Sequence, residues 1–246
     1  MKKLLRGEAI ALFWIGMWAG AAYLVGLPLL LPGPADTMAA LVRLGKTASF
    51  WQSTGTTLLR VAAGYLLAVL SGVLLAAGCA HFKGLDALLS PLRTVIRATP
   101  VTSFIILVML WIQRGRVPVF ISFLMVLPMV WTGVQDALSA VDGDLLEMSR
   151  MYQFSTWKRF RYIYVPAVRP AFLSACTNGL GFAWKSGIAA EVIAQPAFSV
   201  GKNLNDAKVY LETADLFAWT LTVILLSMVL EKALKAALRR WKGETP

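Results

Sequence analysis

Side chains that could perform acid–base, nucleophilic or metal chemistry are few in this sequence and stand apart from one another. His81 is the only histidine, and the two cysteines, Cys79 and Cys176, each lie within an apolar block. Nucleophilic catalysis needs a base within hydrogen-bond reach of the nucleophile, and a metal site needs several closely spaced ligands. Neither arrangement can be assembled, so we expect no catalytic residue, no metal site and no disulfide.

One tripeptide, Gly45-Lys46-Thr47, resembles the end of a phosphate-binding P-loop. That motif also requires an earlier glycine, so that backbone N–H groups can approach the phosphates. The chain has Ala40 at that position. We therefore expect that the chain does not hydrolyse ATP and carries no cofactor of its own.

Two charged residues, Lys185 and Glu191, lie within a long, largely apolar stretch, Ala167–Ala194. A charge inside a bilayer costs about 2.5–3.5 kcal/mol on insertion scales, so both should face protein or water. They are about 240° apart around a helix and do not share a face. Lys185 could line a pathway for an anionic solute, form an ion pair between helices, or extend toward the membrane surface. Glu191 could equally be a gate or a packing contact.

The composition indicates a membrane protein. Hydrophobic residues make up 58% of the 246 residues and charged residues only 15%, far from the balance of a soluble domain. The net charge is +11, but the basic residues sit in short clusters between apolar blocks rather than on one face of a soluble fold. We therefore expect a lipid membrane as the surroundings and no nucleic-acid partner.

Apolar segments of roughly 20 residues are long enough to cross a bilayer as helices. We predict six, of which the third is the shortest. They are Ala9–Leu31, Val61–Ala80, Pro100–Ile112, Val117–Val134, Ala167–Ala194 and Ala214–Leu230.

Lysine and arginine are distributed unevenly between the two sides that six spans define. Most lie on the side of the termini, so the positive-inside rule predicts that both termini are cytoplasmic. Arg114 and Arg116, in the turn before the fourth span, fall on the other side against this trend.

The longest predicted cytoplasmic loop, Asp136–Pro166, reads as two short amphipathic helices. Asp142 is a suitable N-cap for the first helix, and the chain breaks at residues 153–155 before the second. Each helix has an apolar stripe at helical spacing, formed by Leu145, Met148 and Tyr152 and then by Trp157, Phe160 and Tyr164. Pro166 marks a turn into the fifth span. By periodicity alone this loop could also lie on anionic lipid.

The spacing of residues in this loop resembles the EAA signature of ABC-importer permeases, the inner-membrane components of binding-protein-dependent transport systems. The signature has Glu-Ala-Ala, three residues, Gly, nine residues, and Ile-x-Leu-Pro. The chain matches it with Glu147, Met148, Ser149, Gln153, Ile163, Val165 and Pro166. Gln153 is the departure that matters, because glycine adopts positive φ freely whereas glutamine does so at a cost.

Other short blocks resemble the nitrate, sulfonate and taurine branch of this family. These are residues 59–64, 91–93, 141–142, 183–184 and 190–191, the last pair including Glu191. The resemblance implies an all-α, methionine-permease-like transmembrane domain spanning residues 1–246 as one unit, with a family-like core at about 54–240. It also implies a location in the bacterial inner membrane.

The family further implies a homodimer over two ATPase subunits, which bind the ATP, and an external solute-binding protein. The Asp136–Pro166 loop, with Trp157 among its apolar anchors, would dock on the ATPase, while Lys185 and Glu191 are candidates for the translocation pathway. The branch suggests a small anion as solute, although family members with neutral substrates also exist. A secondary transporter and an intramembrane enzyme are the rival interpretations, and neither internal repeats nor a catalytic pair supports them.

Overall fold

The computed structural model describes residues 2–242, with side chains described for residues 9, 10 and 12–238, and its regular secondary structure within this range is entirely helical. It therefore bears out the predicted all-α class. The helices are α1 (Lys2–Val25), α2 (Pro34–Gly45), α3 (Ala48–His81), α4 (Lys83–Ala98), α5 (Val101–Val108), α6 (Val117–Ser139), α7 (Gly143–Met151), α8 (Thr156–Arg159), the π-helix η1 (Phe160–Tyr164), α9 (Val165–Ala194), α10 (Val200–Val209) and α11 (Thr213–Lys242).

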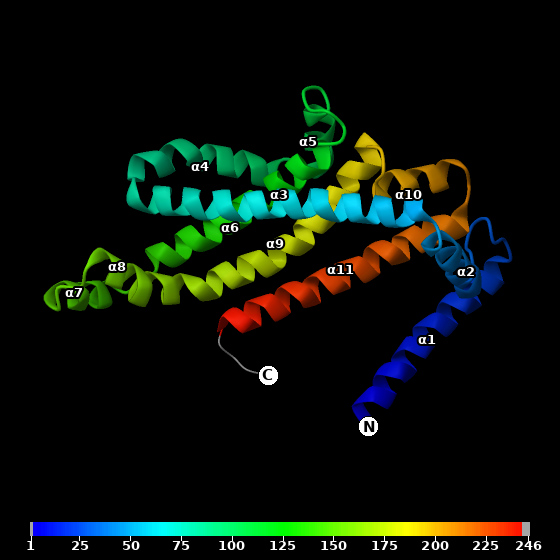
Figure 1. Cartoon of the computed structure of the whole chain (residues 1–246), viewed down its shortest axis with the longest axis horizontal. Coiled ribbons are helices and arrows are strands. Elements are labelled where there is room, and N and C mark those ends of the chain that lie inside the picture. The colour runs from blue at the N-terminus through cyan, green and yellow to red at the C-terminus, as the bar shows by residue number, and fades with distance from the viewer. Residues whose placement is uncertain (1, 243–246) are drawn as a thin grey trace.

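Four long helices, α3, α6, α9 and α11, run along the length of the molecule (Figure 1). The short helices α7 and α8 lie at one end, and α2 and α10 lie at the other. The helix α4 folds back beside α3 from the end near α7. Segments far apart in the sequence therefore meet within one elongated bundle.

The core lies where α6 packs between α3 and α9. Its fully buried side chains include Val126, Val130 and Trp131 of α6 and Ala183 of α9. Two glycines of α3 allow the close approach: a Cβ on Gly64 would lie 2.3 Å from the Val119 carbonyl oxygen, and one on Gly72 would lie 2.9 Å from the Val130 Cβ. Small residues at such contacts let membrane helices approach backbone to backbone.

Only part of the six-span prediction agrees with the helix lengths and composition. Three described helices are long and apolar enough to cross a membrane, within α3, α6 and α11, and they correspond to the second, fourth and sixth predicted spans. The predicted first span ends earlier than expected, because α1 stops at Val25 and its described apolar part begins at Leu12. The predicted fifth span is a helix, α9, but its charged and polar residues keep it outside this group.

The third predicted span, Pro100–Ile112, is wrong as a straight spanning helix. The chain bends by 105° between α4 and α5, and α5 has only eight residues, which rise about 12 Å. The bend follows from Pro100, whose ring disfavours helical geometry at the preceding residue; Thr99 is extended, with ψ of 132°. If the bent pair counts as one broken span, the described chain has up to four.

The glycine contact between α3 and α6 predicts that Gly64→Ala destabilises the protein by about 1–3 kcal/mol, because the added methyl group overpacks against backbone. Gly55→Ala is the matched control in the same helix, since a Cβ there meets nothing within 4 Å. Thermal unfolding of the detergent-purified variants measures the effect. Equal unfolding temperatures for the two variants would contradict this close packing.

Candidate functional site

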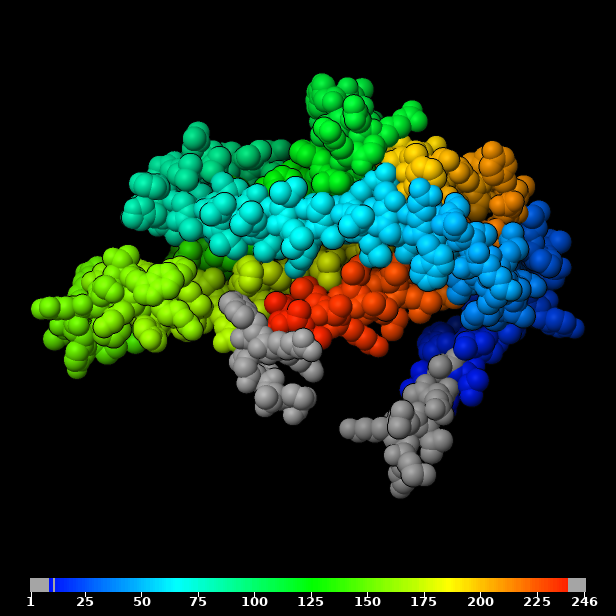
Figure 2. All heavy atoms as spheres, in the orientation of Figure 1, coloured from blue at the N-terminus to red at the C-terminus, as the bar shows by residue number. Residues whose placement is uncertain are grey.

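Two short helices follow α6, as the sequence predicts. The carboxylate of Asp142 caps α7 by accepting a hydrogen bond from the Asp144 N–H at 2.9 Å. The hydroxyl of Ser155 caps α8 in the same way, accepting from the Lys158 N–H at 3.4 Å. Together, α7, α8 and η1 span residues 143–164 and are called the end element below. This element projects from one end of the bundle (Figures 1 and 2).

The turn between α7 and α8 depends on Gln153, which adopts a positive φ of 51°. The Gln153 N–H donates to the Arg150 carbonyl at 3.0 Å, and the Phe154 N–H donates to the Ser149 carbonyl at 2.9 Å. These two bonds form a Schellman motif, which commonly has glycine at the position of Gln153. The glutamine therefore adopts the left-handed conformation of this turn, at the conformational cost expected for a residue with a Cβ.

The predicted signature residues of the end element divide into exposed and buried groups. Glu147, Met148, Gln153 and Trp157 are exposed, and the Trp157 side chain is 70% exposed. Ser149 is fully buried, and its hydroxyl donates to the Leu146 carbonyl at 2.7 Å. Further exposed apolar side chains are Met151, Tyr152, Phe160 and Tyr162. The element therefore offers an apolar surface, whereas Ser149 lies inside the fold.

The prediction that Pro166 marks a turn is wrong. Helical structure continues without a break from Thr156 through η1 into α9, so Val165 and Pro166 lie within one rod. Pro166 has no N–H to donate, and the wider π turn just before it absorbs the mismatch, with the Val165 N–H reaching back to the Phe160 carbonyl. Ile163 is buried within this turn. The end element and α9 are thus directly connected.

The far end of α9 is anchored by Glu191, which is completely buried. Its carboxylate accepts hydrogen bonds from the Thr57 hydroxyl at 2.8 Å and from the Gly201 N–H at 3.2 Å. Arg60 lies 3.4 Å away, and its guanidinium also donates to the Ala197 and Phe198 carbonyls. Of the two roles that the sequence left open, the structure supports a packing contact. We call these residues the Glu191 tie.

The Glu191 tie joins α3, α9 and the segment that leads into α10. A Cβ on Gly201 would lie 2.3 Å from the Glu191 Cβ, so this position requires glycine. Sequence reasoning missed Thr57, Arg60 and Gly201 as partners. A signal was present, because a buried carboxylate needs a cation and hydrogen-bond donors, but only the tertiary fold identifies which ones.

Lys185 lies on a different side of α9 from the Glu191 tie. Its side chain is exposed and lines a cavity of about 560 Å³ between α9, α6 and the junction of α4 and α5. Within the described part of the chain it makes no ion pair or hydrogen bond, so the predicted ion pair between helices does not form there. Because the two residues lie on different sides of α9, Glu191 is paired inside the fold, whereas Lys185 faces a cavity.

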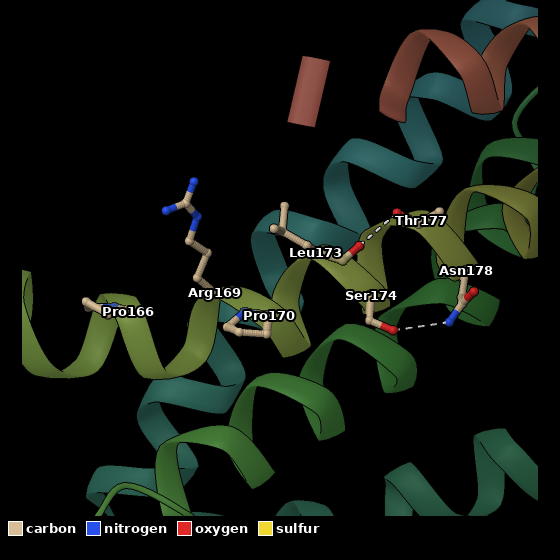
Figure 3. A pocket seen from close by; sticks show the side chains of 7 residues that line it. All are labelled: Pro166, Arg169, Pro170, Leu173, Ser174, Thr177 and Asn178. Carbon is tan, nitrogen blue, oxygen red and sulfur yellow. Dashed lines mark hydrogen bonds between the residues drawn. The ribbon is translucent and has the colours of Figure 1, made fainter. Parts of the chain in front are cut away.

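Two more cavities follow the same side of α9 toward the end element. A cavity of about 360 Å³ is lined by Ser174 and Asn178 of α9 together with Arg97 and Asp136. The next, about 690 Å³, is lined by Ser174 and Asn178 again and by Arg169 and Thr177 (Figure 3). Figure 3 shows the Asn178 amide donating to the Ser174 hydroxyl, at 3.5 Å. Cavities with shared walls therefore line one side of the helix.

Residues 68–242 match the family described as the binding-protein-dependent transport system inner membrane component. The chain belongs to this family, a class of membrane transport components. Its relatives are ABC transporter permeases of the nitrate, sulfonate and taurine branch, as the sequence resemblance predicts. The chain is therefore a permease component of an ABC importer.

Similarity to individual relatives extends over nearly the whole chain. A probable ABC transporter permease of Brucella melitensis is 25% identical, with 98% of each chain covered. The taurine transport system permease of Escherichia coli is 23% identical over 92% of this chain and 86% of its own. The nitrate import permease of Synechococcus elongatus is 27% identical over 66% of this chain and 62% of its own.

A solved structure shares the fold. The crystal structure of an amino acid ABC transporter with histidines superposes with a TM-score of 0.57 at 19% identity, over 76% of this chain and 93% of its own. The helical arrangement described above is therefore that of an ABC transporter chain.

The Glu191 tie predicts that Glu191→Ala destabilises the fold by about 3–5 kcal/mol, since Arg60 and the Gly201 N–H lose a buried partner. Size-exclusion chromatography in detergent measures the yield of folded protein, and thermal unfolding measures the stability of what remains. Glu212→Ala is the control, because Glu212 is exposed and its side chain makes no hydrogen bond or ion pair among the described residues. A Glu191→Ala variant as stable as the control would exclude a structural role for the tie.

The turn at Gln153 predicts an order of stability for substitutions. Gln153→Gly should be tolerated, whereas Gln153→Val should unfold the end element, because a β-branched residue is a poor fit at positive φ. Limited proteolysis of residues 143–164 provides the measurement, with wild type as the reference. The prediction fails if the valine variant resists the protease as well as the glycine variant does.

Proposed function

We propose that two copies of this chain form the translocation pathway of an ATP-driven importer, bound to two copies of an ATPase subunit that binds and hydrolyses the ATP. An external solute-binding protein delivers the solute. The observation that carries the proposal is the unbroken helical connection between the exposed end element and α9, the helix whose side lines the cavities. A movement of the end element would be passed directly to the cavity wall.

The end element is the proposed contact with the ATPase. Exposed Met148 and Trp157 supply apolar anchors, and Glu147 beside them can set the register of docking. The alternative, that these residues only rest on lipid, does not account for the continuous helix from the end element into α9. A switch of the ATPase between two shapes would then become a rotation or shift of α9, which is the basis of alternating access.

The proposed orientation places the end element and both termini in the cytoplasm and the chain in the bacterial inner membrane. The distribution of lysine and arginine supports this orientation. The arrangement also supports it, because α2 and α10 lie at the opposite end of the bundle from α7 and α8 (Figure 1). That opposite end would then face the solute-binding protein.

The proposed solute is a small anion. Two relatives are named for taurine, which carries a sulfonate, and for nitrate. Lys185 lines the cavity beside α9 and has no ion-pair partner among the described residues, so its positive charge would attract an anion. Co-purification of an ATPase with the chain from untreated membranes tests the class of transporter, because a secondary transporter or an intramembrane enzyme would bring none.

The proposed docking role predicts that Glu147→Lys weakens the permease–ATPase complex and ATP-driven uptake at least tenfold, about 1.4 kcal/mol in binding free energy. The reversed charge opposes the register that the glutamate sets. Membrane insertion should remain normal. The measurements are the amount of ATPase co-purified and the uptake of taurine or nitrate into proteoliposomes.

Glu212→Lys provides the matched control, because it makes the same charge change at an exposed position outside the end element. It should leave the amount of co-purified ATPase unchanged. Wild-type uptake and wild-type ATPase recovery with Glu147→Lys would remove the docking proposal.

A further inference from the structure

The cavity beside Lys185 contains a second cation. Arg97, from the last turn of α4, lines the same 560 Å³ cavity as Lys185, and no acidic residue is among its lining side chains. Arg97 is exposed to this space and, like Lys185, forms no ion pair or hydrogen bond within the part of the chain described. Two unpaired positive charges therefore share one space.

The break between α4 and α5 explains why Arg97 is there. The helix α4 ends at Ala98, and the chain bends by 105° at residues 99–100 before α5 begins, so the last turn of α4 lies at the cavity wall. Thr99 and Val101, on either side of Pro100, also line the cavity. The bend that makes the third span prediction wrong thus lies next to Arg97, which lines the same cavity as α9.

The charges of this cavity favour one kind of occupant. Two like charges repel each other, and each is costly at membrane depth unless water or a counter-ion compensates it. Both costs fall when an anion enters between the cations. The rest of the wall is formed mainly by apolar side chains such as Met125, Met129 and Phe182, which lower the local dielectric and strengthen the attraction.

Arg97 also connects this cavity to the next one. It lines the 360 Å³ cavity together with Ser174 and Asn178, which offer neutral hydrogen-bond donors, and with Asp136, which carries the opposite charge. An anion leaving Arg97 would therefore pass from two cations to neutral donors and then meet a carboxylate. Such a gradient limits the depth of the binding well, which a transport site needs for release.

We propose that Lys185 and Arg97 together form an anion-selective site in the translocation pathway, with Arg97 passing the anion to the Asn178 cavity. The inference rests on the proposed function, because only a permease pathway would expose this space to solute. The ligand class is a small oxyanion such as a sulfonate or nitrate, held by charge and by the planar donor fork of arginine.

The test is a charge-selective labelling experiment on the full-length chain in lipid nanodiscs. Ala189, which lines the cavity, is replaced by cysteine after Cys79 and Cys176 are changed to alanine. The rates of modification by an anionic sulfonate-bearing methanethiosulfonate and by its cationic ammonium counterpart are compared, each normalised to its rate with free 2-mercaptoethanol. We expect the anionic reagent to be favoured about tenfold.

Neutralisation of either cation should reduce that preference. Arg97→Gln and Lys185→Gln should each lower the ratio several-fold, and the double variant should bring it close to one. Arg114→Gln, which removes an arginine that does not line the cavity, should leave it unchanged. If Ala189→Cys disrupts folding, Met129→Cys reports on the same cavity.

A normalised ratio near one in the parent, or one that Arg97→Gln leaves unchanged, would overturn the proposal. ATP-driven uptake distinguishes this failure from failure of the proposed function. If the chain recruits an ATPase and transports, but its labelling shows no preference for the anionic reagent, the importer assignment stands and the anion site is excluded. If labelling is anion-selective but no ATPase binds, the anion site stands and the proposed docking of an ATPase on the end element fails.

Discussion

The structure depends on the continuous helical path of the backbone from Thr156 to Ala194. Two prolines, Pro166 and Pro170, lie along this path, and each removes a backbone hydrogen-bond donor. The π turn at Phe160–Tyr164 absorbs the first irregularity, so the helix continues rather than turns. A single continuous helix therefore extends from the exposed surface at one end to the buried carboxylate of Glu191 at the other.

Two charged residues of α9, Glu191 and Lys185, have different surroundings. Glu191 is fully buried and satisfied by Thr57, Arg60 and a backbone N–H, so it fixes α9 to α3 and to the chain leading into α10. Lys185, on another side, lines a cavity and makes no ion pair or hydrogen bond with the residues that the structure describes. A satisfied buried charge holds structure, whereas an unpaired one attracts a mobile counter-ion. Anchoring and the proposed anion selectivity can thus occupy one helix because Glu191 and Lys185 lie on different sides of it.

Local features were predictable because they depend on neighbouring residues. The Asp142 cap, the break near Gln153 and the helix that ends at Ala194 follow from short-range chemistry. Predictions failed at two prolines whose effect depends on the surrounding fold. Pro100 bends the third predicted span, whereas Pro166 does not end a helix. A proline in a sequence shows only that a donor is missing. Whether the chain bends or absorbs the gap depends on how the adjoining helices pack.

By itself, the sequence determined the membrane environment, the helical class and the spacing of the end element. Hydrophobic content, charge clusters and turn residues express these directly along the chain. Only the tertiary structure decided that Arg60 pairs with Glu191 and that Arg97 joins Lys185 at one cavity. Those partners lie far apart in sequence. Their meeting depends on the close approach of α9 to α3, where a Cβ on Gly187 would lie 2.6 Å from the Val61 Cγ2, and on where α4 ends in the fold, which no local pattern encodes.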